Sequence, residues 1–141
     1  MIMKRCELCL VVVIFCAQLV PAGAKGDAGE DAVRLLVDTD ARQHVQIRGS
    51  SYYFEPDHII VKANVPVVLS VRREWGIVPH TFVLEIPGSG IRVDESLSTT
   101  PKTVIFTPTE IGKFEFYCKN KLLFFKSHEE KGMKGILEVV P

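Results

Sequence analysis

The chain has 141 residues, of which 47% are hydrophobic and 24% are charged, a composition typical of one folded domain. This length excludes a multi-domain enzyme, and the hydrophobic content excludes a disordered chain. Seventeen basic residues balance seventeen acidic ones, so the charge favours no nucleic-acid partner.

The first 24 residues have the pattern of a secretory signal peptide. Lys4 and Arg5 precede an apolar run over 10–19, and small residues follow at Ala22, Gly23 and Ala24. The run is too short to span a bilayer by itself. A lipoprotein signal and a retained anchor are the alternatives. We predict a signal peptide over 1–24 and a periplasmic or otherwise exported protein that does not span the membrane after cleavage.

Cleavage would leave Cys118 as the only cysteine, because Cys6, Cys9 and Cys16 lie in the predicted signal. A lone thiol cannot form an intramolecular disulfide, and compartments beyond the membrane are usually oxidising. We therefore expect Cys118 to be deeply buried or bound to another group.

Residues 25–43 are predicted to form a flexible leader with a first strand, and 44–141 to form the folded domain. Short β-rich runs alternate there with proline and glycine, without sustained helical periodicity. We expect strands at 33–37, 44–48, 51–54, 59–62, 67–73, 81–86, 103–107, 113–118 and 135–140. This spacing predicts an all-β fold, an antiparallel sandwich or barrel.

Period-two alternation places Cys118 on the same face as two phenylalanines of its strand, Phe114 and Phe116. The thiol is therefore expected to point inward at one end of the sandwich. The long segment 119–132 follows, with room for a short helix, and a loop of this length in a compact domain is usually functional or mobile.

Four side chains around these loops are candidates for one metal site: His80, Cys118, His128 and Met133. His80 precedes a strand, and the other three lie at or after the end of another. Two imidazoles, a thiolate and a thioether together describe a mononuclear electron-transfer copper centre.

With these residues the sequence resembles the cupredoxins, the small blue copper proteins, most closely the plastocyanin-like branch. The resemblance rests on Val78-Pro79-His80, on the approach from Thr107 to Cys118, and on His128-x4-Met133 before a β run. It implies a Greek-key sandwich with one copper ion, equatorial ligands His80, Cys118 and His128, and Met133 as a weak axial ligand. It also implies that the Pro79 carbonyl lies opposite, and that Thr81 ties the ligand loops together.

The chain departs from this family in one place. Nine residues separate Cys118 from His128, whereas the family usually has two to four. The entropy of closing a longer loop grows slowly, so the site is not forbidden, but ligand geometry, colour and potential are in doubt.

Other polar residues are expected to stay outside the site. His44 and His58 fit half-exposed sheet positions, and Glu55 and Glu74 fit solvated ones. Trp75 fits either the core or the rim near His80. The run 122–125 either folds back as a small cluster, the interpretation we favour, or forms an exposed patch.

The function expected from this set is that of an exported one-electron carrier, and not an enzyme. Its redox partner proteins would dock near the lysine-rimmed 119–134 loop, whose local charge of +3 favours an acidic partner, and the carrier itself is expected to be a monomer. The alternatives are a periplasmic copper carrier or store, and a copper site with an open position that binds a small ligand.

Overall fold

The computed structural model describes residues 32–141. The predicted signal peptide over 1–24 and residues 25–31 of the predicted leader lie outside the described residues. These residues form ten strands and two short 3-10 helices: β1 (Val33–Arg34), β2 (Gln43–Ser50), β3 (Tyr53–Glu55), β4 (His58–Lys62), β5 (Val67–Arg73), β6 (Thr81–Ile86), η1 (Pro87–Ser89), β7 (Ile91–Ser96), β8 (Lys102–Phe106), β9 (Gly112–Tyr117), η2 (Glu129–Lys131) and β10 (Lys134–Val140), all within 32–141.

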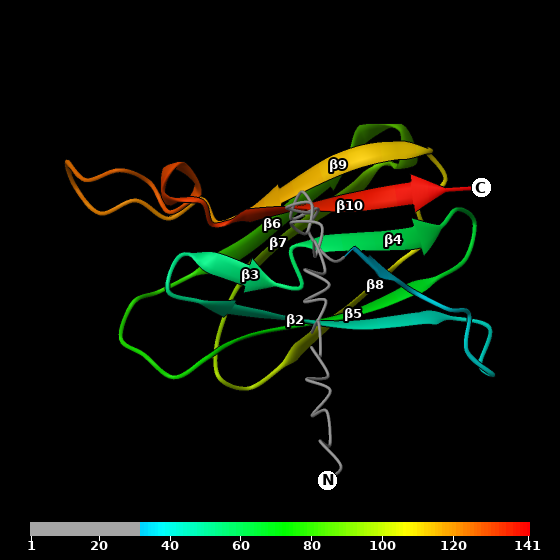
Figure 1. The fold of residues 1–141 in the computed structure, drawn as a ribbon, viewed down its shortest axis with the longest axis horizontal. Helices are drawn as coiled ribbons and strands as arrows, with labels where there is room; N and C mark the ends of the chain where they lie inside the picture. The colour runs from blue at the N-terminus through cyan, green and yellow to red at the C-terminus, as the bar shows by residue number, and fades with distance from the viewer. Residues whose placement is uncertain (1–31) are drawn as a thin grey trace, which may run out of the picture.

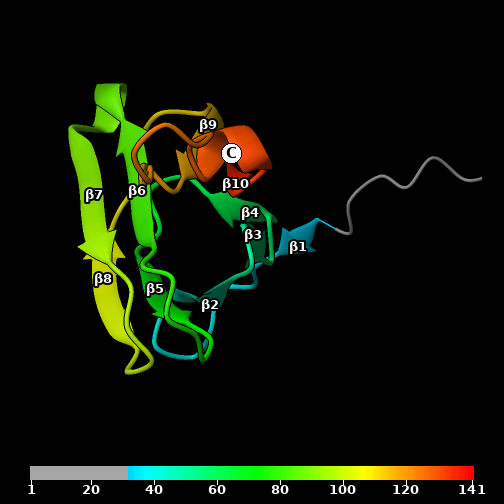
Figure 2. The ribbon, with the colours of Figure 1, turned by 90° about the vertical axis from the view of Figure 1, so that its left-hand side faces the viewer.

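The strands form two layers, which Figure 2 shows end-on. One sheet has the order β1-β4-β10-β9-β6-β7 and the other the order β3-β2-β5-β8. The predicted all-β sandwich is therefore confirmed. Part of the expectation was wrong, because the sheets are mixed rather than purely antiparallel. β2 pairs parallel with β5, and β4 pairs parallel with both β1 and β10.

Side-chain alternation could not have revealed these parallel pairs, because the pattern of a strand is the same in either direction. Parallel neighbours need a crossover connection. Here β3 and β4 lie in different sheets between β2 and β5, so the chain crosses the sandwich and returns in the same direction. The order of the strands, and not their hydrophobic pattern, sets the mixed topology.

The core lies between the layers and follows the predicted alternation. Alternate residues of β5 are buried, as are Phe82, Leu84 and Ile86 of β6. Three rings, Phe54, Phe82 and Phe116, pack with centroids 5.2 to 5.7 Å apart. Phe116 belongs to β9, so this aromatic cluster lies next to the end of that strand.

Two predicted details differ in the structure. The first strand is only two residues long, and β7 is a strand that the sequence pattern did not indicate. Between β9 and β10 the predicted long loop is present, and its only helical turn within the described chain is η2. Among residues 32–141, no helix has the length and apolar character needed to cross a bilayer.

Candidate metal centre

Cys118 follows the last residue of β9 and is fully buried, as predicted. The pleat of β9 places it on the inner face with Phe116, while its backbone N–H donates to the carbonyl of Met133 at 3.0 Å. Both strand pairing and core packing therefore fix the position of the sulfur.

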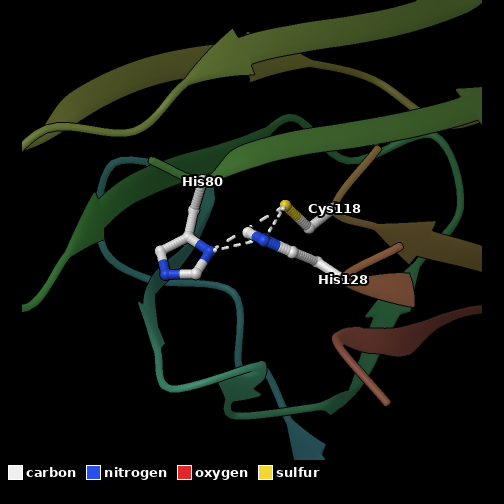
Figure 3. A group of neighbouring side chains, drawn as sticks. All are labelled: His80, Cys118 and His128. Atoms are coloured by element: carbon white, nitrogen blue, oxygen red, sulfur yellow. Dashed lines mark hydrogen bonds between the residues drawn. The ribbon is translucent and has the colours of Figure 1, made fainter. Parts of the chain in front are cut away.

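His80 lies immediately before β6 and is 6% exposed. Its carbonyl accepts a hydrogen bond from the backbone N–H of Leu97 at 2.9 Å, which ties it to the end of β7. The ring points into the end of the sandwich toward Cys118 (Figure 3).

His128 comes from the long loop, yet it is held as firmly as a strand residue. Its backbone N–H donates to the carbonyl of Asn120 at 2.8 Å, and its carbonyl accepts from Met133 at 2.9 Å. The first bond closes residues 121–127 into a separate outward projection, which we call the excursion loop. His128 is thus positioned next to Asn120 in space despite the seven intervening residues.

The three side chains converge (Figure 3). The Nδ1 atoms of His80 and His128 lie 3.1 Å apart, and the Cys118 sulfur lies 4.0 Å and 3.4 Å from them, respectively. The point equidistant from the three atoms lies about 2.1 Å from each, within the range of about 2.0–2.3 Å at which nitrogen and sulfur bind a metal ion such as zinc. The donor set therefore fits a single ion.

The chemistry of the donors favours copper over other metals. A trigonal set of two histidines and one cysteine is the arrangement of mononuclear electron-transfer copper sites, in which a long thioether bond often completes the site. Met133 is fully buried and is hydrogen-bonded through its backbone to both Cys118 and His128. Ligation by these four residues stays a prediction.

Both imidazoles are in an environment that favours the neutral form. Burial, then the neighbouring His128 and Arg73, lowers the pKa of His80 to about 4. Burial and then Lys131 lower the pKa of His128. A metal ion binds the neutral ring, so the cluster is ready for a cation at neutral pH without first losing protons from these rings.

A hydrogen-bond network connects the two loops behind the ligands. The backbone N–H of Thr81 donates to the Cys118 sulfur at 3.3 Å, and the Thr81 hydroxyl accepts from the Lys119 N–H at 3.1 Å. The predicted tying role of Thr81 is therefore present. Bonds of this kind orient metal ligands.

Asn120 completes the network, and the sequence reasoning missed it. Its side-chain oxygen accepts from the Thr81 hydroxyl at 3.0 Å, and its Nδ2 donates to the Pro79 carbonyl at 2.9 Å. With its own carbonyl held by His128, Asn120 contacts every loop of the cluster. The only sequence feature that pointed to Asn120 is its position two residues after Cys118.

Tyr52 is a second site residue that the sequence pattern did not indicate. Its ring stands edge-on to both imidazoles, with centroid separations of 4.8 Å to His128 and 6.3 Å to His80. The ammonium of Lys131 lies 4.2 Å from the centre of the Tyr52 ring, within cation–π range. Tyr52 therefore covers the histidine pair on the side facing solvent.

Residues expected to stay outside the cluster do so. His44 contacts Asp40, and His58 contacts Glu138. Glu55 and Glu74 both face the guanidinium of Arg48.

The expected burial of 122–125 was wrong, because these four side chains are 62% to 100% exposed. The excursion loop closes on itself through a turn from Leu122 to Phe125, and no other element of residues 32–141 covers it. Trp75, for which two positions were open, is 95% exposed. Between the excursion loop and residues 77–79 lies a hollow of about 590 Å³, and His128 forms part of its wall.

Comparison with known proteins agrees with this description. A sequence model of the cupredoxin-like domain family matches residues 8–135, which confirms the resemblance drawn from the motifs. Among curated protein sequences, none matches the chain significantly.

Solved structures give a likeness of fold. The metal-binding domain of the Cu(I)-exporting P-type ATPase of Streptococcus pneumoniae D39, solved with Cu(I), is 21% identical, with a TM-score of 0.59 and coverage of 79% of this chain and 98% of that one. Auracyanin B is 20% identical (TM-score 0.56, coverage 76% and 94%). The auracyanin of Roseiflexus castenholzii is 15% identical (TM-score 0.55, coverage 70% and 97%).

Proposed function

We propose that this chain, which belongs to the cupredoxin-like domain family, is a one-electron carrier that holds one copper ion between His80, Cys118 and His128, with Met133 as the axial ligand. One observation carries the proposal: two imidazole nitrogens and one thiol sulfur surround a point about 2.1 Å from each, a metal–ligand bond length. Copper bound there would supply one-electron chemistry by alternating between Cu(II) and Cu(I).

The residues around the site hold the copper ligands in place and provide a path for the electron to the surface. Cys118 and His80 lie at the ends of strands, and the Thr81–Asn120 bonds fix the loops that carry them, so the donors have little freedom to move. A site that cannot rearrange suits both oxidation states. His128 borders the hollow at the surface, so an electron would enter and leave through its ring.

We also propose where the protein is located and which redox partners it meets. We propose a periplasmic or otherwise exported protein with a signal peptide over 1–24, a leader with a first strand over 25–43 and the copper domain over 44–141. It would act as a monomer, and the lysines of the 119–134 loop would favour redox partners with an acidic surface. As a carrier it would transform no substrate.

The test is an absorption spectrum of the protein loaded with Cu(II). We expect an intense thiolate-to-copper band that bleaches on reduction and returns on oxidation with one electron per copper. Cys118→Ser removes this band, whereas Met133→Leu keeps copper and raises the potential. A protein that binds one copper without the band, or a Cys118→Ser variant with an unchanged spectrum, would refute the assignment.

Copper delivery is the second candidate. It is supported by the excursion loop next to His128, because no other element in the described part of the chain covers this loop. The likeness to the metal-binding domain of a Cu(I)-exporting ATPase fits this candidate. Exchange of bound copper with a chelator within seconds, together with slow electron exchange, would favour delivery over electron transfer. A spectrum altered by azide would instead favour an open position for a small ligand.

A further inference from the structure

The end of the sandwich that carries the His80–Cys118–His128 cluster exposes an unusual amount of apolar surface. Seven of the thirteen exposed large hydrophobic residues in the described chain lie on two loops there, 74–80 and 121–127. Trp75 is 95% exposed, Ile77 97% and Phe124 100%. Isolated exposed apolar residues are ordinary, but a group of this size marks an interaction site.

The two loops form one continuous surface. Figure 1 shows both projecting from the same end of the sheets, and Figure 2 looks onto this end. Ile77 and Val78 line one side of the hollow between the loops, and Leu122 and Phe125 line the other. We call this surface, together with the exposed Trp75 and Phe124 on the same two loops, the apolar end.

Lysines lie on the excursion-loop side of the apolar end. Lys121 and Lys126 lie on the excursion loop itself, and in the described part of the chain no carboxylate lies within ion-pair distance of either ammonium. Lys119 is paired with Asp94, and Lys131 lies over Tyr52. Three acidic residues lie on or beside the two loops: Glu74 faces Arg48, Glu130 accepts a hydrogen bond from the backbone of Ser127, and Glu129 begins η2.

We propose that the apolar end binds the surface of an anionic phospholipid bilayer. Trp75, Ile77 and Phe124 enter the boundary between headgroups and acyl chains, and the lysines meet the lipid phosphates. Aromatic and aliphatic side chains combined with lysine are the composition of segments that lie in this boundary. Basic residues near the surface add attraction to anionic lipid.

The shape of the surface favours lipid over a folded protein partner. Almost fully exposed side chains on two separate loops would need matching cavities in a protein partner, because protein interfaces are closely packed. A fluid bilayer accepts such projections without preformed cavities. The inference goes beyond electron transfer and does not depend on bound metal, although it would bring the His128 edge to redox partners at the membrane.

Trp75 is the only tryptophan of the chain, so its fluorescence reports this surface directly. The metal-free full-length protein is titrated with vesicles of phosphatidylcholine and phosphatidylglycerol, and with vesicles of phosphatidylcholine alone. On the anionic vesicles we expect a blue shift of Trp75 emission and quenching by lipids brominated in the acyl chain. The neutral vesicles give a much weaker response, and added salt reduces the anionic response.

Variants separate the two components of binding. Phe124→Ser is expected to weaken vesicle binding about tenfold, because one large inserted side chain is removed. The double change Lys121→Gln and Lys126→Gln weakens binding to anionic vesicles by about tenfold and leaves the weak response to neutral vesicles unchanged. Ile111→Ser is the matched control: Ile111 is 59% exposed but precedes β9, at the opposite end of the sandwich.

Three results would overturn the proposal: unchanged Trp75 emission on anionic vesicles, vesicle binding with Trp75 still in water (attachment through another segment), or equal losses in Phe124→Ser and Ile111→Ser. A blue shift produced by an acidic protein but not by vesicles would assign the apolar end to a protein partner instead. Since the measurement uses metal-free protein, its failure leaves the copper assignment untouched, and failure of the copper assignment leaves this test intact.

Discussion

Phenylalanine occupies two contrasting regions of this molecule. Phe54, Phe82 and Phe116 pack edge-on or tilted in the core beneath the metal cluster, whereas Phe124 and Phe125 stand in solvent on the excursion loop. Phe124 and Phe125 follow Phe116 by only eight and nine positions in the sequence. The contrast separates the part of the chain that builds the site from the part that extends beyond it.

The same contrast explains how a long loop can carry a well-placed ligand. The distance along the chain from Cys118 to His128 does not fix their geometry, because the bond from the His128 N–H to the Asn120 carbonyl closes the extra residues off. The positions of the ligands are then set by Asn120 and by the strands, and not by the length of the loop. The excursion loop is free to serve another purpose.

The largest expected difference is in the free energy of unfolding, when a phenylalanine of each region is replaced by alanine. Phe116→Ala leaves a cavity in the aromatic cluster and should lower the free energy of unfolding by about 3–5 kcal/mol. Phe124→Ala removes only exposed surface and should change it by less than about 0.5 kcal/mol. Urea unfolding of the metal-free proteins measures both values. Similar losses in the two variants would mean that the excursion loop packs against the domain.

The next largest effect is a dependence of folding stability on pH, which originates in the buried histidines His80 and His128. The pKa of His80 is about 4 in the folded protein and near its ordinary 6.5 when unfolded. Between these values the unfolded chain binds a proton that the folded protein does not, so stability is lost as pH falls from about 6.5 to about 4. The lowered pKa of His128 acts in the same direction.

For the metal-free protein, the contribution of His80 to this loss is at most about 3 kcal/mol. Urea unfolding across this pH range measures it. His80→Gln should flatten the profile, and Phe124→Ala should leave it unchanged. A profile in His80→Gln as steep as that of the parent protein would place the titrating group elsewhere.

Replacing Asn120, which lies where the excursion loop meets the ligand cluster, should have a smaller effect on stability. Asn120→Ala removes the hydrogen bonds to the Pro79 carbonyl and the Thr81 hydroxyl, and should cost about 1–2 kcal/mol of folding free energy. It should also shift the thiolate-to-copper band of the loaded protein, because the loop that carries His80 then loses its Asn120 bonds and stays connected to the Cys118 loop through the two Thr81 bonds. Thr81→Ser keeps the hydroxyl and serves as the control. If both variants retain the parent spectrum, the network has no influence on the ligands.

Removing residues 122–126 should have the smallest effect on the site. Asn120, Lys121, Ser127 and His128 would then form a four-residue turn, closed by the bond already present between the Asn120 carbonyl and the His128 N–H. Stability should change by less than about 1 kcal/mol, and the copper spectrum should be retained. Binding to anionic vesicles should disappear. Loss of the copper band would show that the excursion loop itself positions His128.

Much of this site was predictable from the sequence because local patterns carry it. Alternation along β9 placed Cys118 inside the sandwich, and the histidine and methionine motifs pointed to the loops that meet it. The parallel pairing of β2 with β5 and the bond that closes the excursion loop were not predictable, because both arise from contacts between distant segments. The exposure of Phe124 belongs to the same class: hydrophobicity alone does not say whether a neighbouring element covers a side chain.

The most direct test of the central assignment is copper X-ray absorption on the full-length protein loaded with one equivalent of copper. The expected result is one sulfur atom at a short distance from copper together with two imidazole nitrogens, and no such sulfur in Cys118→Ser. A spectrum with only nitrogen and oxygen neighbours around copper, identical in the parent protein and Cys118→Ser, would contradict the assignment.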